Sequence, residues 1–287
     1  MIDEKNKVEK STLYLVATPI GNLADISERA IKVLSEADFV AAEDTRNSLR
    51  LLSALGIKQE LVSYHEHNKK SSGERIVARL LAGESCALIT DAGMPAISDP
   101  GEDIVRLCSD SGITVSVIPG ACAAVSALSL SGLATTRFAF EGFLSAVKSE
   151  RKKQLERVKH EDRTMIFYEA PHKLKQTLSD MAEVFGLDRK VSLCRELTKL
   201  NEEIKRTNFD DAIAFYSKNE PRGEYVLVVE GFSGEIVNDQ TSELIQLSPE
   251  DHVKKYENDG MTRMDAIKRA AKDRKMSKSE LYKILNT

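Results

Sequence analysis

The chain has 287 residues, with 41 Lys and Arg against 45 Asp and Glu, which gives a formal net charge of −4. It is 41% hydrophobic and 30% charged, an ordinary composition that excludes a disordered, collagen-like or coiled-coil protein. The length predicts about two domains. Judged by the overall charge alone, nucleic acid is an unexpected partner, because proteins that bind phosphate are usually basic.

The four cysteines, Cys86, Cys108, Cys122 and Cys194, include no C-x-x-C pair. Each lies in apolar or helical surroundings, so we expect buried, reduced thiols. The first ten residues are polar, without the apolar run of a signal peptide. The apolar runs further along are far shorter than the roughly 20 residues that span a bilayer. These features predict a cytoplasmic protein.

Short apolar runs alternate with helical patterns from the start of the chain. Strands are predicted at residues 13–17, 38–42, 60–63, 85–90 and 114–118. Helices are predicted between them, around residues 26–34, 47–55, 74–81 and 102–109. Continuous apolar strands joined by helices are typical of a parallel sheet that is buried on both faces. Residues 1–119 are therefore predicted to form an α/β domain.

A second α/β domain is predicted at residues 120–232. Its strands are expected at residues 138–140, 164–168, 190–194, 204–207 and 224–230. Its helices are expected around residues 121–130, 148–159, 173–185 and 210–217. The β-branched segments of the third and fifth strands favour a mixed sheet.

The end of the chain has a different character. Residues 233–247 are polar and aperiodic, as in a linker, and residues 248–287 carry the signals of short capped helices. Ser248 precedes Pro249 at one helix start, while Thr262 and Ser277 begin two capping-box-like patterns. Apolar stripes follow at Ala266, Ile267, Ala270 and Ala271, and at Leu281, Ile284 and Leu285. We expect a helix-turn-helix-like module.

Three loops follow predicted strands and open helices, where backbone N–H groups can face a ligand. Residues 18–22 contain one glycine, so an ordinary βα turn explains them as well as a binding loop does. Residues 91–101 hold two Gly, two Pro and two Asp. A helix cap explains Ser98 or Asp99, whereas residues 91–93 favour a ligand. Residues 118–121 permit either close approach to a flat ligand or helix–sheet packing.

Charged clusters also end predicted strands. Residues 43–46 form a polar wall that could face a substrate. His65, Glu66 and His67 are of metal-ligating types, but neighbours on an extended chain point to opposite faces, so no metal is expected. Residues 195–199 are either a surface ion-pair cluster or a phosphate-binding cation pair. The motifs of P-loop NTPases, α/β-hydrolases and zincins do not occur.

In their order and spacing, eight segments of the chain resemble the RsmI (YraL) family, the ribosomal RNA small subunit methyltransferase I group of the tetrapyrrole-methylase superfamily. The segments are TPIGNLADI (18–26), EDTR (43–46), DAGMPAISDPG (91–101), IPG (118–120), FEGFL (140–144), YEAPH (168–172), RELTK (195–199) and GEY (223–225). The resemblance covers residues 12–232, and a C-terminal helical module is also typical of many members.

The resemblance implies two α/β domains of the tetrapyrrole methylase type with S-adenosylmethionine in the cleft between them. It implies methylation of the ribose 2′-oxygen of a cytidine in the decoding region of small-subunit ribosomal RNA, free or in an assembled 30S-type subunit. A homodimer is expected by resemblance only. Residue by residue, the cofactor pocket would be lined by Pro19, Gly21, Asp91, Ala92, Gly93, Met94, Ser98, Gly120 and Ala121.

The reaction needs a group that helps the 2′-hydroxyl proton leave and cations that hold phosphate. For the first role the candidates are Glu43, Asp44 and Lys199. For RNA binding the candidates are Arg46, Arg195, Arg263, Lys268, Arg269, Lys272 and Lys278. Two alternatives remain, namely a methyltransferase acting on a small tetrapyrrole-like ring and a non-catalytic ribosome-binding or RNA-binding module.

The net charge of −4 hides an uneven distribution. Residues 261–287 hold eight Lys or Arg and three Asp or Glu, a net of +5, so the other 260 residues carry −9. This basic segment is either a solvated helical surface or a phosphate-binding one, and the predicted helix-turn-helix favours the second. The expectation from overall charge is therefore reversed, and we expect RNA to dock on the C-terminal module.

Truncation after Gly234 is predicted to weaken RNA binding and to flatten its dependence on salt, because the released counterions would be fewer. The affinity for S-adenosylmethionine should stay unchanged. Filter binding across a salt series and calorimetry with the cofactor measure the two effects, and an unchanged salt dependence would contradict the assignment.

Overall fold

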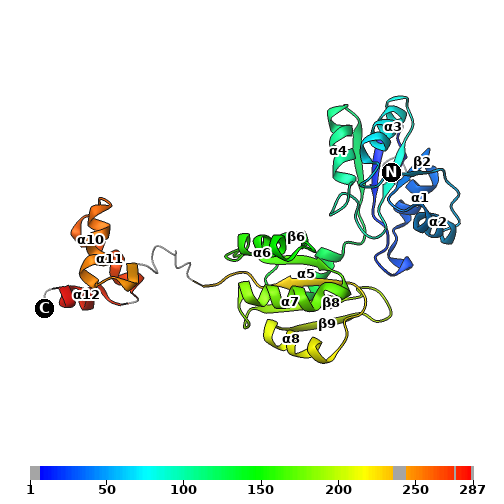
Figure 1. Ribbon diagram of the computed structural model, residues 1–287. Coiled ribbons are helices and arrows are strands. Elements are labelled where there is room, and N and C mark those ends of the chain that lie inside the picture. Colours follow the sequence, from blue (N-terminus) through cyan, green and yellow to red (C-terminus); the bar gives the residue numbers. More distant parts are fainter. Residues whose placement is uncertain (1–6, 235–243, 275, 286–287) are drawn as a thin grey trace. The chain divides into compact units, whose positions relative to one another are not determined.

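The computed structural model describes residues 7–234, 244–274 and 276–285. The chain divides into two compact units, Met1–Phe232 and Ser233–Thr287, and the first of them contains two β-sheets (Figure 1).

The first sheet has five parallel strands in the order β3-β2-β4-β1-β5. The strands are β1 (Thr12–Val16), β2 (Phe39–Ala42), β3 (Leu61–Ser63), β4 (Cys86–Ile89) and β5 (Thr114–Ile118). Strands β2 and β4 are buried along their whole length, which explains why their sequences are apolar without alternation.

Helices cover both faces of this sheet, and a 3₁₀ turn, η2 (Leu23–Asp25), precedes the first of them. The helices α1 (Glu28–Glu36) and α2 (Thr45–Ala54) pack on one face. The helices α3 (Lys69–Leu81) and α4 (Gly101–Asp110) pack on the other. The neighbours β1 and β4 therefore lead to helices on opposite faces, so their carboxyl ends form the switch point at which open α/β sheets bind ligands.

The second sheet is mixed, as predicted, with the order β6-β7-β10-β8-β9. Its strands are β6 (Phe138–Phe143), β7 (Thr164–Glu169), β8 (Lys190–Arg195), β9 (Glu203–Asn208) and β10 (Tyr225–Val229). Only β6 and β7 run parallel, and the other neighbouring strands are antiparallel.

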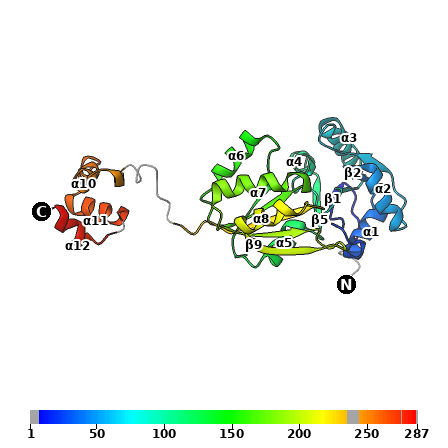
Figure 2. The same cartoon turned by 60° about the horizontal axis from the view of Figure 1, so that its bottom comes forward.

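Helices lie on both faces of the second sheet (Figure 2). The side chains of the sheet alternate between these two helical layers. Met165 and Phe167 of β7 face α6 (Lys148–Arg157), α7 (Pro171–Phe185) and α8 (Phe209–Lys218). Ile166 and Tyr168 face α5 (Ala123–Ser131) on the other side. The α5 side is the one that reaches the functional site.

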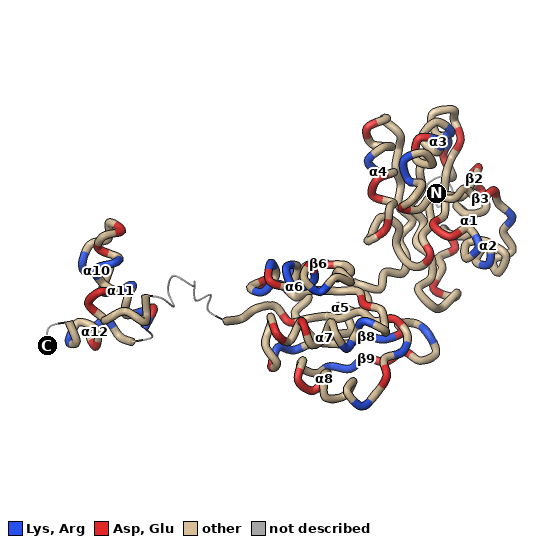
Figure 3. The backbone as a smooth tube through the Cα atoms, viewed as in Figure 1, with Lys and Arg blue, Asp and Glu red and all other residues tan. Residues whose placement is uncertain are grey.

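The unit Ser233–Thr287 contains α10 (Pro249–Asn258), α11 (Arg263–Asp273) and α12 (Lys278–Leu285). The three start signals read from the sequence are confirmed as caps. The hydroxyls of Ser248, Thr262 and Ser277 accept hydrogen bonds from backbone N–H groups three residues later, at 3.1, 3.3 and 3.2 Å. Figure 3 shows basic residues along this unit. Within the second apolar stripe, Leu281 is buried, whereas Ile284 is 49% exposed.

The predicted strands and helices are all present, with small differences at their ends. Helix α3 begins at Lys69 rather than at residue 74, and β6 continues to Phe143 rather than ending at residue 140. The predicted division at residue 120 stays a prediction, because one compact unit holds both sheets. Within the described ranges, no helix is both long enough and apolar enough to cross a membrane.

Candidate functional site

The loops that follow β1 and β4 are joined backbone to backbone. The N–H of Thr18 donates to the carbonyl of Gly93 at 2.9 Å, and the N–H of Gly93 donates to the carbonyl of Thr18 at 3.1 Å. This isolated bridge fixes the two loops at the switch point of the sheet.

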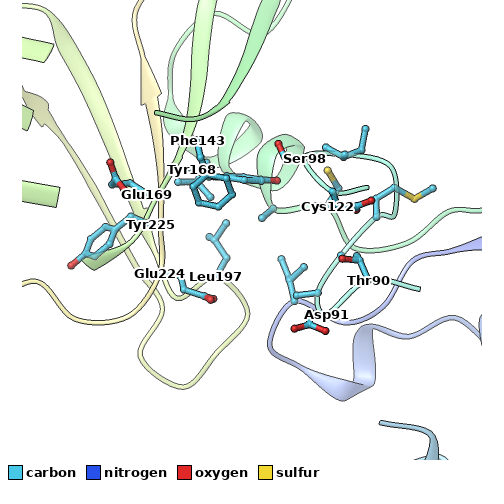
Figure 4. A pocket seen from close by; sticks show the side chains of 18 of the residues that line it. Thr90, Asp91, Ser98, Cys122, Phe143, Tyr168, Glu169, Leu197, Glu224 and Tyr225 are labelled. Atoms are coloured by element: carbon cyan, nitrogen blue, oxygen red, sulfur yellow. The ribbon is translucent and has the colours of Figure 1, made fainter. Parts of the chain in front are cut away.

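A cavity of about 410 Å³ opens beside this bridge, with walls from both sheets of the first unit (Figure 4). Its volume lies in the range of small-molecule sites. The residues from the first sheet and its loops are Ile20, Glu43, Thr90, Asp91, Ala92, Gly93, Met94, Ile97, Ser98 and Asp99. The other wall consists of Cys122, Ala123, Phe143, Tyr168, Glu169, Ala170, Cys194, Glu196, Leu197, Lys199, Glu224, Tyr225 and Val226.

Segment 91–101 forms one wall in an unusual backbone conformation. Ala96 and Ser98 have φ angles of 67° and 64°, which L-residues rarely adopt. The carboxylate of Asp99 accepts hydrogen bonds from the N–H groups of Ala96, at 2.9 Å, and Gly101, at 2.7 Å. The N-cap residue of α4 is Pro100, which makes no side-chain cap bond, so the expected cap at Ser98 or Asp99 is wrong. Asp99 instead accepts the first N–H of the helix from one residue further out and holds the strained loop.

The hairpin loop 196–202 between β8 and β9 is strained in the same way. Glu196 and Thr198 have φ angles of 50° and 65°. Among the described residues, four of the five non-glycine residues with positive φ lie in this loop or in segment 91–101. Such strain persists only where surrounding contacts fix it, and it concentrates at functional sites.

Glycines allow the two halves of the cavity to approach closely. A Cβ on Gly21 would overlap with the side chain of Lys199 and lie 2.9 Å from Oγ1 of Thr198. A Cβ on Gly142 would lie 3.0 Å from Oγ of Ser98, and Gly142 has a φ of 65°. The cavity is thus closed by contacts that larger residues would prevent.

Glu43 is a half-buried carboxyl group in the cavity wall. Its Oε2 accepts a hydrogen bond from Oγ1 of Thr90 at 3.0 Å. Burial raises the pKa of Glu43, and the charges of Asp91 and Asp99 raise it further against the effect of the Thr90 hydroxyl. A carboxylate with a raised pKa is a better proton acceptor than an ordinary one.

Asp91 connects the cavity to α2. Its carboxylate accepts hydrogen bonds from the backbone N–H of Asp44, at 3.3 Å, and from Nδ2 of Asn47, at 3.2 Å. Both donors lie at the N-terminus of α2, so the orientation of Asp91 is set before any ligand binds.

Asp44 is not among the residues lining the cavity. It is the N-cap of α2, and its Oδ1 accepts the N–H of Arg46 at 2.8 Å. The guanidinium of Arg46 lies 3.1 Å from the same carboxylate and lowers the pKa of Asp44. The Arg46 side chain is 87% exposed, so it remains available to a ligand at the surface.

Lys199 reaches the cavity from the other side. Its Nζ lies 2.9 Å from Glu196 and 2.8 Å from Glu224. Burial lowers its pKa, but the hydrogen bonds to Glu224 and Glu196 outweigh burial and raise it above the usual value. Lys199 is therefore a cation held in place, and it cannot serve as a proton acceptor near neutral pH.

The structure brings most of the expected site residues together. Two of the three catalytic candidates, Glu43 and Lys199, line the cavity. Of the expected cofactor residues, Asp91, Ala92, Gly93, Met94 and Ser98 also line it. The remaining four lie next to lining residues, since Pro19 and Gly21 flank Ile20, and Gly120 and Ala121 precede Cys122.

The candidate RNA-binding residues fall into two groups. Arg46 and Arg195 belong to the first unit, and Nε of Arg195 lies 3.1 Å from Glu203. In the helical unit, Arg263 pairs with Glu257 and Arg269 pairs with Asp273. The other three candidates of that unit, Lys268, Lys272 and Lys278, are exposed and form no ion pair with another described residue.

The sequence interpretation missed part of the wall formed by the second sheet. Phe143, Tyr168, Glu169, Glu224 and Tyr225 lie in the segments that carry the family resemblance, and that signal could have placed them in the site. The expectation for one cysteine was also wrong, because Cys122 is only half-buried and faces the cavity, whereas the other three thiols are buried.

The cluster His65, Glu66 and His67 does not gather ligands. Glu66 pairs with Lys69 at 2.8 Å, and the two imidazole rings meet edge to face at 5.9 Å. Within the part of the chain that the structure describes, no group of three His, Cys, Asp or Glu side chains is placed to hold a metal ion.

The fold is similar to that of several solved structures. The chain is similar to uroporphyrin-III-C-methyltransferase from Thermus thermophilus, with a TM-score of 0.54, 21% identity, and coverage of 76% of this chain and 94% of that one. It is also similar to diphthine synthase, with a TM-score of 0.57, 14% identity, and coverage of 76% and 90%. The tetrapyrrole (corrin/porphyrin) methylase family matches residues 12–213, which defines the class of the protein.

Curated relatives identify one family within this class. The chain is 49% identical to ribosomal RNA small subunit methyltransferase I of Halalkalibacterium halodurans, over 96% of this chain and 95% of that protein. It is 48% identical to the protein of that name in Bacillus subtilis, with coverage of 96% and 94%. The chain therefore belongs to the ribosomal RNA small subunit methyltransferase I family, and it is a methyltransferase that uses S-adenosylmethionine.

Proposed function

We propose that this enzyme methylates the ribose 2′-oxygen of a cytidine in the decoding region of small-subunit ribosomal RNA. The observation that carries the proposal is the 49% identity, over almost the whole chain, to a ribosomal RNA small subunit methyltransferase I. The cavity between the two sheets supplies the site for the reaction.

The residues present fit S-adenosylmethionine. The cavity is lined by six carboxyl side chains and a single lysine, so it favours a ligand with a positive sulfonium and a positive ammonium group. Apolar side chains such as Ile20, Met94 and Leu197 supply the surface that a nucleoside needs. The expected cofactor residues, from Asp91 to Met94 with Ser98, and Pro19, Gly21, Gly120 and Ala121 beside them, would hold it.

When bound, S-adenosylmethionine supplies an electrophilic methyl group on a positively charged sulfur. The main task of the chain is then orientation, since alignment of two reactants contributes up to roughly 7–11 kcal/mol in ideal cases. The strained, closely packed segment 91–101 and loop 196–202 are suited to this task, because their contacts fix their conformation before binding.

Glu43 is the best-placed acceptor for the proton of the 2′-hydroxyl. It lines the cavity, and its raised pKa makes its carboxylate more basic than that of an exposed glutamate. Lys199, fixed as a cation by Glu196 and Glu224, would stabilise the developing negative charge on the 2′-oxygen. Asp44 would act indirectly, by capping α2 and positioning Arg46.

RNA would reach the site through basic side chains outside the cavity. Arg46 and Arg195 lie close to the site in sequence and fold, and we propose that they contact phosphates. The cations of the helical unit, which are Arg263, Lys268, Arg269, Lys272 and Lys278, would add the sequence-independent part of the affinity.

The two other functions from the sequence remain as alternatives. A tetrapyrrole-like acceptor is favoured by the fold shared with uroporphyrin-III-C-methyltransferase, but that likeness is at 21% identity and extends to the fold alone. A purely RNA-binding protein would have no use for a cavity of about 410 Å³ lined by carboxylates. Ribosomal RNA is therefore the better-supported acceptor.

The assembled small subunit is the substrate that we propose, and the cytoplasm is the compartment that contains it. We also propose a homodimer. Its support is the resemblance to the RsmI family. Light scattering on the full chain tests this state, and a monomeric mass would contradict it.

Radiolabelled S-adenosylmethionine should transfer label to the RNA of small subunits purified from cells that lack this enzyme. Small subunits that already carry the modification should take up no label, because their 2′-oxygen is occupied. Nuclease digestion and chromatography then identify the methylated nucleoside. If ribosomal RNA took up no label, the proposed function would be contradicted.

Replacement of Glu43 by Gln is predicted to lower the rate of methyl transfer by about 100-fold, which is the usual effect of losing a proton acceptor. In the unaltered enzyme the rate should fall as pH falls through the raised pKa of Glu43, because the protonated carboxyl cannot accept a proton. The Glu43→Gln variant should lack this dependence.

Lys199→Met should also lower the rate, since a cation is lost from the cavity wall. Asp44→Asn is the matched control, because asparagine also caps helices well and Asp44 does not line the cavity. Single-turnover measurements with saturating cofactor report these rates. Near-normal rates for both Glu43→Gln and Lys199→Met would contradict the assignment of catalytic residues.

A further inference from the structure

An irregularity in β6 places two phenylalanines on the same face of the second sheet. In a regular strand, residues three apart point to opposite faces. The register between β6 and β7 shifts between Phe140 and Gly142, where a β-bulge adds one residue. Phe140 and Phe143 therefore both contact the ring of Tyr168, at centroid distances of 5.1 and 5.3 Å. Bulges of this kind redirect a side chain and are frequent beside active sites.

The supporting ring is fixed in position. The hydroxyl oxygen of Tyr168 accepts a hydrogen bond from the backbone N–H of Ala124 at 3.2 Å, at the start of α5. Phe140 packs on one side of Tyr168 within the α5 layer. Phe143 meets Tyr168 edge to face, with an angle of 62° between the rings. Phe143 is thus held by a rigid aromatic neighbour.

Phe143 itself is open to solvent and to the cavity. It is 56% exposed although it lines the cavity wall. A Cβ on the residue before it, Gly142, would lie 3.0 Å from Oγ of Ser98, so this part of β6 lies close to the loop expected to hold the cofactor. Figure 4 shows Phe143 and Ser98 at the same cavity. An exposed aromatic ring held rigidly next to a reaction site has a flat, uncharged face to offer a ligand.

We propose that Phe143 is a stacking platform for the target nucleobase. The proposal rests on the function proposed above and adds a substrate-positioning residue to the same site. The cavity lies between the two sheets, so a nucleotide has to leave the stack before its 2′-hydroxyl can enter it. The base then loses its stacking partners, and an aromatic side chain replaces part of that interaction.

The adenine ring of the cofactor is the other flat ring that could stack on Phe143. The 56% exposure of Phe143 favours the RNA base, because RNA approaches the cavity from solvent. The RNA base and the adenine ring can be distinguished by measurement, since only stacking with adenine would change the affinity for S-adenosylmethionine.

The test compares Phe143→Leu with Phe143→Tyr and Phe143→Trp. Leucine keeps an apolar side chain but removes the flat ring, whereas tyrosine and tryptophan keep the ring. The matched control is Phe138→Leu, because Phe138 lies on the same strand, is 42% exposed and does not line the cavity. Thermal unfolding checks that each variant folds, and Phe143→Met replaces the leucine variant if that one does not.

The measurements are kcat/KM for unmodified small subunits and the dissociation constant of S-adenosylmethionine by calorimetry. Phe143→Leu should lower kcat/KM about tenfold, as expected for the loss of one stacked base. The tyrosine, tryptophan and Phe138→Leu variants should stay within about twofold of the unaltered enzyme. Cofactor affinity should not change in any of them.

Equal kcat/KM for Phe143→Leu and the unaltered enzyme would overturn the platform. If Phe143→Leu weakened the binding of S-adenosylmethionine as much as it lowered kcat/KM, the proposal would also be overturned, because the ring would then stack on the adenine of the cofactor. Loss of activity in the tyrosine and tryptophan variants would also overturn the proposal, because these side chains keep a flat ring and the activity would then depend on the exact shape of Phe143. Failure of the unaltered enzyme to methylate small subunits is a separate result, which overturns the proposed function itself.

Discussion

The contact between loop 18–22 and loop 196–202 is the constraint on which the site depends. The first loop follows β1 of the parallel sheet, and the second joins β8 to β9 of the mixed sheet. Gly21 leaves no room for a Cβ against Thr198 and Lys199. This close approach brings Lys199 into the cavity that contains Glu43, so a packing constraint decides which polar groups can act together.

Strain in the surrounding backbone follows from the same constraint. Residues such as Ser98 and Thr198 adopt positive φ angles, each of which costs on the order of 1–3 kcal/mol. Local hydrogen bonds offset this cost. Asp99 holds the turn around Ala96, and the carboxylate of Glu196 accepts the N–H of Glu224 at 2.9 Å. The cavity is therefore organised by the chain before any ligand binds, as orientation of two reactants requires.

The sequence predicted the strands, the helices and the cavity wall of the first sheet, because each depends on local patterns. Parallel strands read as apolar runs, and the turn residues of segment 91–101 follow one of them. The wall of the second sheet depends on pairing between strands. Phe143 faces the cavity because of a register shift against β7, and no spacing within β6 reveals that shift. Cys122 was misjudged for a similar reason, since the site opens beside it.

The charge distribution separates the binding of S-adenosylmethionine from the binding of RNA phosphates, because the two need surfaces of opposite charge. A cavity with six carboxyl groups and one lysine attracts a cationic methyl donor but repels the phosphates of RNA. Phosphates are thus best held outside it, by exposed cations such as Arg46 and by the basic helical unit. The part of a nucleotide that can enter is the uncharged ribose with its base. An aromatic wall at Phe143 and Tyr168 can receive that base without meeting the repulsion that a phosphate would meet.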